Sequence, residues 1–142
     1  MQVKVKVHPG GRMPERHGEC FDLATTKRVK MKAGEVQVIS LGVSIELPEG
    51  VHGIVAARSS TALKWGIIPA NGIGIIENDY NGDGDVWGLV AYALRDTEIP
   101  PYTRIAQFRT MCRMPDVELV QVDSLGNDDR GGYGSTGQAA KQ

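Results

Sequence analysis

Short runs of apolar residues, many of them alternating with polar ones, cover most of the chain. Residues 3–7 alternate valine with lysine, which predicts a strand with one buried face. Further apolar runs, each bounded by residues typical of turns, lie at 36–40, 43–47, 53–57, 86–94, 104–108 and 117–122. We expect the runs at 36–40 and 43–47 to pair with each other, and the run at 53–57 to be buried on both faces. The pattern predicts an all-β fold, a jelly-roll-like barrel or sandwich.

One segment has the features of a short helix instead. Residues 62–66 follow Ser59, Ser60 and Thr61; either serine can cap a helix of about two turns, and Gly66 can end it. Because the helix follows the run at 53–57 and Arg58, free backbone N–H groups, two hydroxyls and a guanidinium lie together. That combination suits an anion such as phosphate. The alternative is an ordinary helix cap beside a surface arginine.

The segment at 71–82, Asn-Gly-Ile-Gly-Ile-Ile-Glu-Asn-Asp-Tyr-Asn-Gly, concentrates amides, glycines, carboxylates and a tyrosine. We expect residues 73–76 to end a strand and a turn at 81–82 or 83–84 to lead into the run at 86–94, as in a hairpin. Such a hairpin can present backbone groups, a carboxylate and an aromatic ring to a flat ligand such as a nucleobase. An ordinary surface hairpin is the alternative, because Asn, Asp and Gly are common turn residues.

Composition narrows the functional classes. The 142 residues are 41% hydrophobic, enough for one domain with a core, and the net charge of -1 argues against binding a nucleic-acid polymer. The N-terminus alternates polar with apolar residues, so it is not a signal peptide, and no stretch could span a membrane. The two cysteines form no disulfide framework. We therefore expect a cytoplasmic protein that binds a small ligand.

The last residues differ from the rest. Residues 126–142 are rich in glycine and have almost nothing to bury, so they are expected to be flexible when no ligand is bound. The glycines, Ser135, Thr136 and Tyr133 could wrap an anion and stack on a ring. We therefore expect a β-barrel domain at 1–125 and an arm at 126–142 that orders on a ligand. The alternative for the arm is a disordered low-complexity tail.

Five short motifs in order resemble those of the homotrimeric deoxyuridine triphosphatases (dUTPases). They lie at 21–24, 58–60, 71–82 and 104–107 and in the tail sequence Gly-Gly-Tyr-Gly-Ser-Thr-Gly. The insertion at 82–87 and the run at 91–99 resemble a phage- or Bacillus-like branch. The resemblance implies a jelly-roll-like subunit in a trimer whose active sites are shared between subunits. It also implies hydrolysis of dUTP to dUMP and pyrophosphate, with Mg²⁺ held by the substrate phosphates and water.

The resemblance also implies roles for individual residues. Glu77 and Asp22 are the catalytic candidates, one as the base that activates water and the other as support for Arg58 and the water shell of the metal. Tyr80 packs on the deoxyribose, and the tail of another subunit closes the site. The residues expected to bind the substrate are Arg58, Ser59, Ser60, Asn71, Gly74, Ile75, Ile76, Tyr80, Gln107, Arg130, Tyr133, Gly134, Ser135 and Thr136.

The chain departs from the family pattern in two places. Glu77 stands where the family has aspartate, and its longer side chain could lower activity by up to about a hundredfold if the pocket does not accommodate it. Tyr133 replaces the commoner phenylalanine, and Trp87 in the insertion is a second candidate to stack on uracil. Alternatives are therefore a catalytically weak or silent nucleotide-binding relative with a regulatory role, dCTP deaminase, and a plain β-sandwich binding domain.

Overall fold

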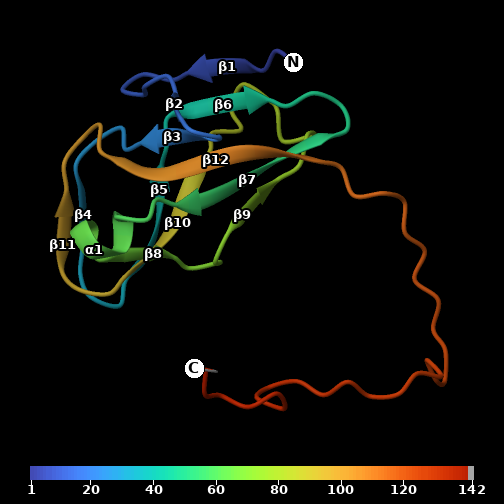
Figure 1. Ribbon diagram of the computed structural model, residues 1–142. Coiled ribbons are helices and arrows are strands. Elements are labelled where there is room, and N and C mark those ends of the chain that lie inside the picture. The colour runs from blue at the N-terminus through green and yellow to red at the C-terminus, as the bar shows by residue number, and fades with distance from the viewer. Residues whose placement is uncertain (141–142) are drawn as a thin grey trace.

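The computed structural model describes residues 1–140, which form twelve strands and one short helix (Figure 1). The elements in chain order are β1 (Lys4–Val7), β2 (Glu15–His17), β3 (Cys20–Ala24), β4 (Val29–Met31), β5 (Val36–Ser40), β6 (Val43–Glu46), β7 (Val51–Ala57), α1 (Thr61–Trp65), β8 (Ile67–Pro69), β9 (Gly74–Ile76), β10 (Gly88–Ala93), β11 (Thr97–Ile99) and β12 (Arg104–Cys112). The predicted all-β, jelly-roll-like class with one short helix is confirmed. No helix in this part of the chain is long and apolar enough to cross a membrane.

The strands form a five-stranded sheet in the order β2-β3-β12-β7-β9 and three smaller sheets, β5-β10-β8, β1-β6 and β11-β4. The inner face of the five-stranded sheet packs on the core. There the rings of Phe21 and Phe108 stack at 5.2 Å, and Trp87 meets Phe108 edge-on at 5.1 Å. Gly53 faces the same place, where an added Cβ would lie 3.1 Å from the Trp87 ring. The opposite face of this sheet is therefore the one that can carry a site.

The predicted pairing of the runs at 36–40 and 43–47 is wrong. Both form strands, but β5 pairs with β10 while β6 pairs with β1. The backbone of Trp87 separates them, because its N–H donates to Val43 and its carbonyl accepts from Leu41. Each strand consequently pairs within a different sheet.

The predicted hairpin between 73–76 and 86–94 is also wrong. β9 pairs with β7, with Ile76 opposite Gly53, and β10 pairs with β5 and β8. Residues 77–87 therefore form a connection between two sheets. This leaves β9 at the edge of the five-stranded sheet.

Two further expectations need correction. β7 is buried on one face only, since Gly53 and Val55 are buried while Ile54 and Ala56 are partly exposed. The run at 117–122 forms no strand; the Arg113 N–H still donates to the Gly50 carbonyl, and the chain that follows leads away from the body (Figure 1). A strand requires a neighbouring strand for its backbone hydrogen bonds, and the described residues offer this segment none.

The helix forms where the sequence predicts it. Ser60 occupies the N-cap position without a side-chain capping bond, and Gly66 ends the helix with φ of 62°. Thr61 is buried and its hydroxyl donates to the Ile105 carbonyl at 2.8 Å. This bond ties the start of α1 to β12.

Candidate functional site

The outer face of the five-stranded sheet carries two of the predicted site residues, Asp22 and Gln107. Glu15 lies opposite Asp22, Asp22 opposite Gln107, and Gln107 opposite Ala56. Directly opposite residues in antiparallel strands project from the same face, so their side chains form one row across β2, β3, β12 and β7. Arg58 and the two serines follow β7 at the end of this row.

Asp22 is the centre of a charged cluster on this row. Its side chain is only 3% exposed, and Oδ2 lies 3.1 Å from Nε of Arg58 and 3.5 Å from Nη1 of Arg104. His17 Nε2 is 4.0 Å away. A buried carboxylate is favourable only beside compensating charges, which the two guanidinium groups supply. The carboxylate of Asp22 therefore lies where it can hold both guanidinium groups in position.

The Asp22 carboxylate still has capacity to bind. Oδ2 has no partner in hydrogen-bonding geometry, so its contacts with the arginines are close but not aligned as hydrogen bonds. Within residues 1–140 no three His, Cys, Asp or Glu side chains converge as a metal site. Asp22 Oδ2 is therefore available as a hydrogen-bond acceptor.

The neighbouring residues are held by backbone carbonyls. Arg58 Nη1 donates to the Arg104 carbonyl at 3.2 Å, and Gln107 Nε2 donates to the Ala57 carbonyl at 3.1 Å. Ser59 is exposed and Ser60 half-buried, and the Ser60 hydroxyl makes no cap bond. The remaining guanidinium N–H groups and the serine hydroxyls are donors suited to an anion.

The contribution of β2 is not evident from the sequence. His17 Nε2 lies 2.6 Å from Arg104 Nη1, and Glu15 Oε2 lies 3.4 Å from the same nitrogen. Because arginine only donates, a hydrogen bond here requires the His17 tautomer in which Nε2 is the acceptor. The strand is three residues long and too short to show an alternating pattern.

A second group of predicted residues surrounds β9. Asn71 precedes this strand, Gly74, Ile75 and Ile76 form it, and Glu77 follows it. The sheet order places no strand beside the outer edge of β9 within the described residues, so its backbone groups on that side are available. An edge of this kind can read the hydrogen-bonding edge of a flat base through the main chain.

Glu77 lies in a cleft of about 530 Å³ that His52, Asp79 and Arg113 also line. Tyr80 stands just beyond it, half-exposed, and its hydroxyl donates to the Val86 carbonyl at 3.3 Å. The Tyr80 N–H donates to the Glu77 carbonyl at 3.2 Å, so the carboxylate, the ring and the strand edge lie in one region, and their roles there stay predictions.

The Asp22 cluster and the group around β9 form two half-sites. Comparison with known proteins identifies the family of the chain that carries them. A model of the dUTPase family matches residues 14–137. The chain belongs to the dUTPase family.

Its relatives include dUTPases of phages and of cellular organisms. An SPbeta prophage-derived deoxyuridine 5'-triphosphate nucleotidohydrolase of Bacillus subtilis is 50% identical over 120 residues, 84% of each chain. A deoxyuridine 5'-triphosphate nucleotidohydrolase of Yarrowia lipolytica is 32% identical over 144 residues, 96% of this chain and 90% of the other. A mutant dUTPase of Staphylococcus bacteriophage 80alpha, solved with dUpNHpp, aligns with a TM-score of 0.77 at 23% identity and covers 96% of this chain and 98% of its own.

The two half-sites of this dUTPase lie far apart within one chain. Val55 pairs with Gly74, and Gly53 pairs with Ile76. Extending this register by one residue places Glu77 opposite His52. Asp22 is level with Ala56, which lies four residues from His52 along β7, and β3 is three strands away from β9. With strand spacings of about 4.8 Å and a rise of about 3.3 Å per residue, Glu77 and Asp22 are about 20 Å apart. One chain of the dUTPase does not bring them to the same reacting atom.

The tail residues do not approach either half-site of the same chain. Arg130, Tyr133 and Gly134 to Thr136 are exposed on the segment that leads away from the body (Figure 1). Tyr133 has a positive φ of 53°, and the backbone turns at 132–137. Their assignment to the dUTPase site stays a prediction.

The alternative role for Trp87 is wrong. Its side chain is 1% exposed and packs on Phe108, so it cannot stack on a base in this fold. Core packing decides its position, because burying an indole contributes more than any surface contact.

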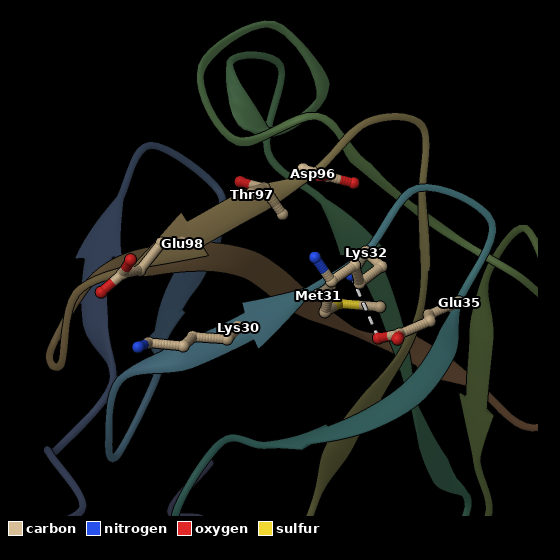
Figure 2. Close-up of a pocket in the computed structure, with 7 residues that line it drawn as sticks. All are labelled: Lys30, Met31, Lys32, Glu35, Asp96, Thr97 and Glu98. Carbon is tan, nitrogen blue, oxygen red and sulfur yellow. Dashed lines mark hydrogen bonds between the residues drawn. The ribbon is translucent and has the colours of Figure 1, made fainter.

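Another cleft, of about 430 Å³, is lined by the paired strands β4 and β11 and the loops beside them and contains none of the predicted dUTPase residues (Figure 2). Its carboxylates already serve the fold. Glu35 accepts from the Lys32 N–H at 3.1 Å, and Asp96 accepts from the Ala33 N–H at 2.9 Å. Glu35 and Asp96 therefore hold the loops around the cleft in place.

Proposed function

We propose that this chain hydrolyses dUTP to dUMP and pyrophosphate at active sites that are each assembled from different subunits of a homotrimer. The supporting observation is the separation of about 20 Å between Glu77 and Asp22 on one sheet face, estimated from strand geometry. A base must lie within about 3–3.5 Å of the water or atom it acts on. A neighbouring chain can supply the phosphate-binding half where a single chain does not.

The surface offers apolar area for such an assembly. Val36, Val38, Tyr92 and Ile68 are exposed on one face of the β5-β10-β8 sheet, where Tyr92 lies opposite both Val36 and Ile68. The segment beyond β12 exposes further apolar side chains, namely Val117, Leu119, Val120, Val122 and Leu125. Exposed apolar surface of this extent is typical of an interaction site, and a second copy of the chain is the partner that the proposal requires.

In the proposed mechanism, Glu77 orients a water molecule and accepts its proton as the water attacks the α phosphorus of dUTP. The bond from this phosphorus to the bridging oxygen breaks, and pyrophosphate leaves. Arg58, Ser59, Ser60 and Gln107 of a neighbouring subunit donate hydrogen bonds to the phosphates and stabilise their charge. Phosphoryl transfer depends mainly on such positioning and charge stabilisation.

Recognition of the nucleoside uses the edge of β9. Asn71 and the backbone at 74–76 pair with the uracil edge, and cytosine would leave polar groups unpaired there. Tyr80 packs on the deoxyribose and leaves no room for a 2′-hydroxyl. The tail of the third subunit brings Arg130, Tyr133, Gly134, Ser135 and Thr136 over the phosphates and the base, which excludes water.

The proposal includes Mg²⁺ bound to the substrate phosphates. A mutant dUTPase of phage phi11 of S. aureus has been described with a structural Mg(II) ion. Magnesium keeps several waters and binds phosphates readily, and it neutralises part of their charge. The buried Asp22 Oδ2, which has no hydrogen-bond partner, fits as an acceptor for one of those waters.

We also propose that the chain works in the cytoplasm. Cys20 and Cys112 are free thiols. Reduced cysteines are typical of proteins in a reducing compartment.

The test is pyrophosphate release from dUTP with Mg²⁺, compared with dCTP, dTTP and UTP, for the unaltered chain and Glu77→Asp. The proposal predicts release from dUTP and little from the other nucleotides. Preference for dCTP, or an unaltered chain that is silent while Glu77→Asp is active, contradicts it. The second result would favour a nucleotide-binding relative whose base is misplaced.

A further inference from the structure

The loop at 81–86 has no role in the reaction as described above, yet it is highly hydrogen-bonded. Asp85 Oδ2 accepts the Gly82 N–H at 2.8 Å, and the Asp85 N–H donates back to the Gly82 carbonyl at 3.1 Å. The Asn81 amide donates to the Asn78 carbonyl at 2.8 Å. These bonds give an exposed loop a defined shape.

The end of this loop is fixed to the core. Trp87 is buried, and its backbone bonds to Val43 and Leu41 hold it between β5 and β6. The preceding Val86 carbonyl therefore has a fixed position. It accepts the bond from the Tyr80 hydroxyl, and the Tyr80 N–H in turn donates to the Glu77 carbonyl at 3.2 Å.

From this connection we infer that the loop at 81–86 is a positioning device for Tyr80, and that Asp85 and the Val86 carbonyl control discrimination between deoxyribose and ribose. The inference rests on the proposed function, which places the Tyr80 ring against the sugar. A tyrosine at an exposed site rotates readily unless its hydroxyl is held. A ring held in one place excludes a 2′-hydroxyl, whereas a ring free to move accommodates it.

The loop has a second attachment that gives a control. Asp83 lies on the side near β1, where its carboxylate is 3.4 Å from Lys6 Nζ and 89% exposed. Its backbone carbonyl, not its side chain, accepts from the Ser44 hydroxyl at 3.4 Å. Removing the Asp83 side chain therefore changes the loop charge as Asp85 removal does, but leaves the turn at 82–85 intact.

The experiment compares kcat/KM for dUTP with kcat/KM for UTP in four variants. Tyr80→Phe removes only the hydroxyl, and Asp85→Ala removes the acceptor for Gly82 together with one charge. For each we expect the dUTP-to-UTP ratio to fall about fivefold, the factor that corresponds to one hydrogen bond, mainly through faster UTP turnover. Asp83→Ala should keep the ratio of the unaltered chain.

Tyr80→Ala separates the inference from the proposed function. If this variant loses discrimination while Tyr80→Phe and Asp85→Ala retain it fully, the ring reads the sugar but the loop does not position it, and the inference is overturned. If Tyr80→Ala also retains full discrimination, the sugar assignment in the proposed function is wrong, and the inference falls with it. Melting temperatures measured beside the ratios show whether a variant has lost its fold rather than its selectivity.

Discussion

Replacing Asp22 with asparagine should destabilise the fold by removing the charge that holds two arginines. Asp22 is 3% exposed, while its partners Arg58 and Arg104 are 29% and 37% exposed. Breaking a fully buried ion pair from one side costs about 3–5 kcal/mol. Because both arginines are partly hydrated, we expect about 2–3 kcal/mol here, or a melting temperature lower by about 5–10 °C.

The assay is thermal unfolding followed by circular dichroism at one fixed protein concentration, since assembly makes the melting temperature depend on concentration. Glu15→Gln is the matched control, because it removes a carboxylate from the same cluster. Glu15 is 65% exposed and 3.4 Å from Arg104, so its loss should cost less than about 1 kcal/mol. Equal melting temperatures for the two variants would refute the conclusion that the buried charge of Asp22 organises the cluster.

Three other changes test separate parts of the account. Glu77→Gln should reduce pyrophosphate release by about 10²–10⁴-fold, the usual contribution of a general base, while calorimetry still detects nucleotide binding; normal turnover would exclude Glu77 as the base. Deleting residues 131–142 should lower turnover but leave the mass measured by light scattering unchanged, and an unaffected rate would contradict a closing tail. Trp87→Ala should cost about 3–5 kcal/mol of unfolding free energy measured with denaturant, and a near-normal value would argue against a core role.

Local sequence patterns predicted the longer strands and the helix, but not their partners and not the short strands β2, β4, β8 and β11, and they wrongly predicted a strand at 117–122. The strands at β1, β7, β10 and β12 and the helix at α1 follow from alternation, apolar runs and the Ser60 and Gly66 signals. Strand pairing depends on contacts far apart in the chain. The Trp87 backbone lies between β5 and β6 and prevents them from pairing with each other. Neither strand's own sequence indicates this.

The candidate site was predictable as two lists of residues and not as one arrangement. The motifs named Asp22 with Arg58 and Glu77 with Tyr80, and the fold keeps each pair in its own region. The distance between the pairs depends on the order of four strands in one sheet, which periodicity does not reveal. The contribution of His17 was hidden for a related reason, because β2 is short and its contact with Arg104 spans 87 residues.

Mixing two inactive variants tests the shared active site most directly. One carries Glu77→Gln and keeps the phosphate-binding half, and the other carries Arg58→Ala together with Gln107→Ala and keeps the base. The two proteins are unfolded and refolded together at equal concentrations, and pyrophosphate release from dUTP is measured against each refolded alone. If each site takes its base from one chain and its phosphate-binding half from another, mixing should restore about a quarter of the unaltered activity. Each half then comes from a competent chain in about half of the sites, so both halves are competent in about one site in four. Activity no greater than the sum of the two variants alone, in mixed oligomers verified by mass, would contradict a site shared between subunits.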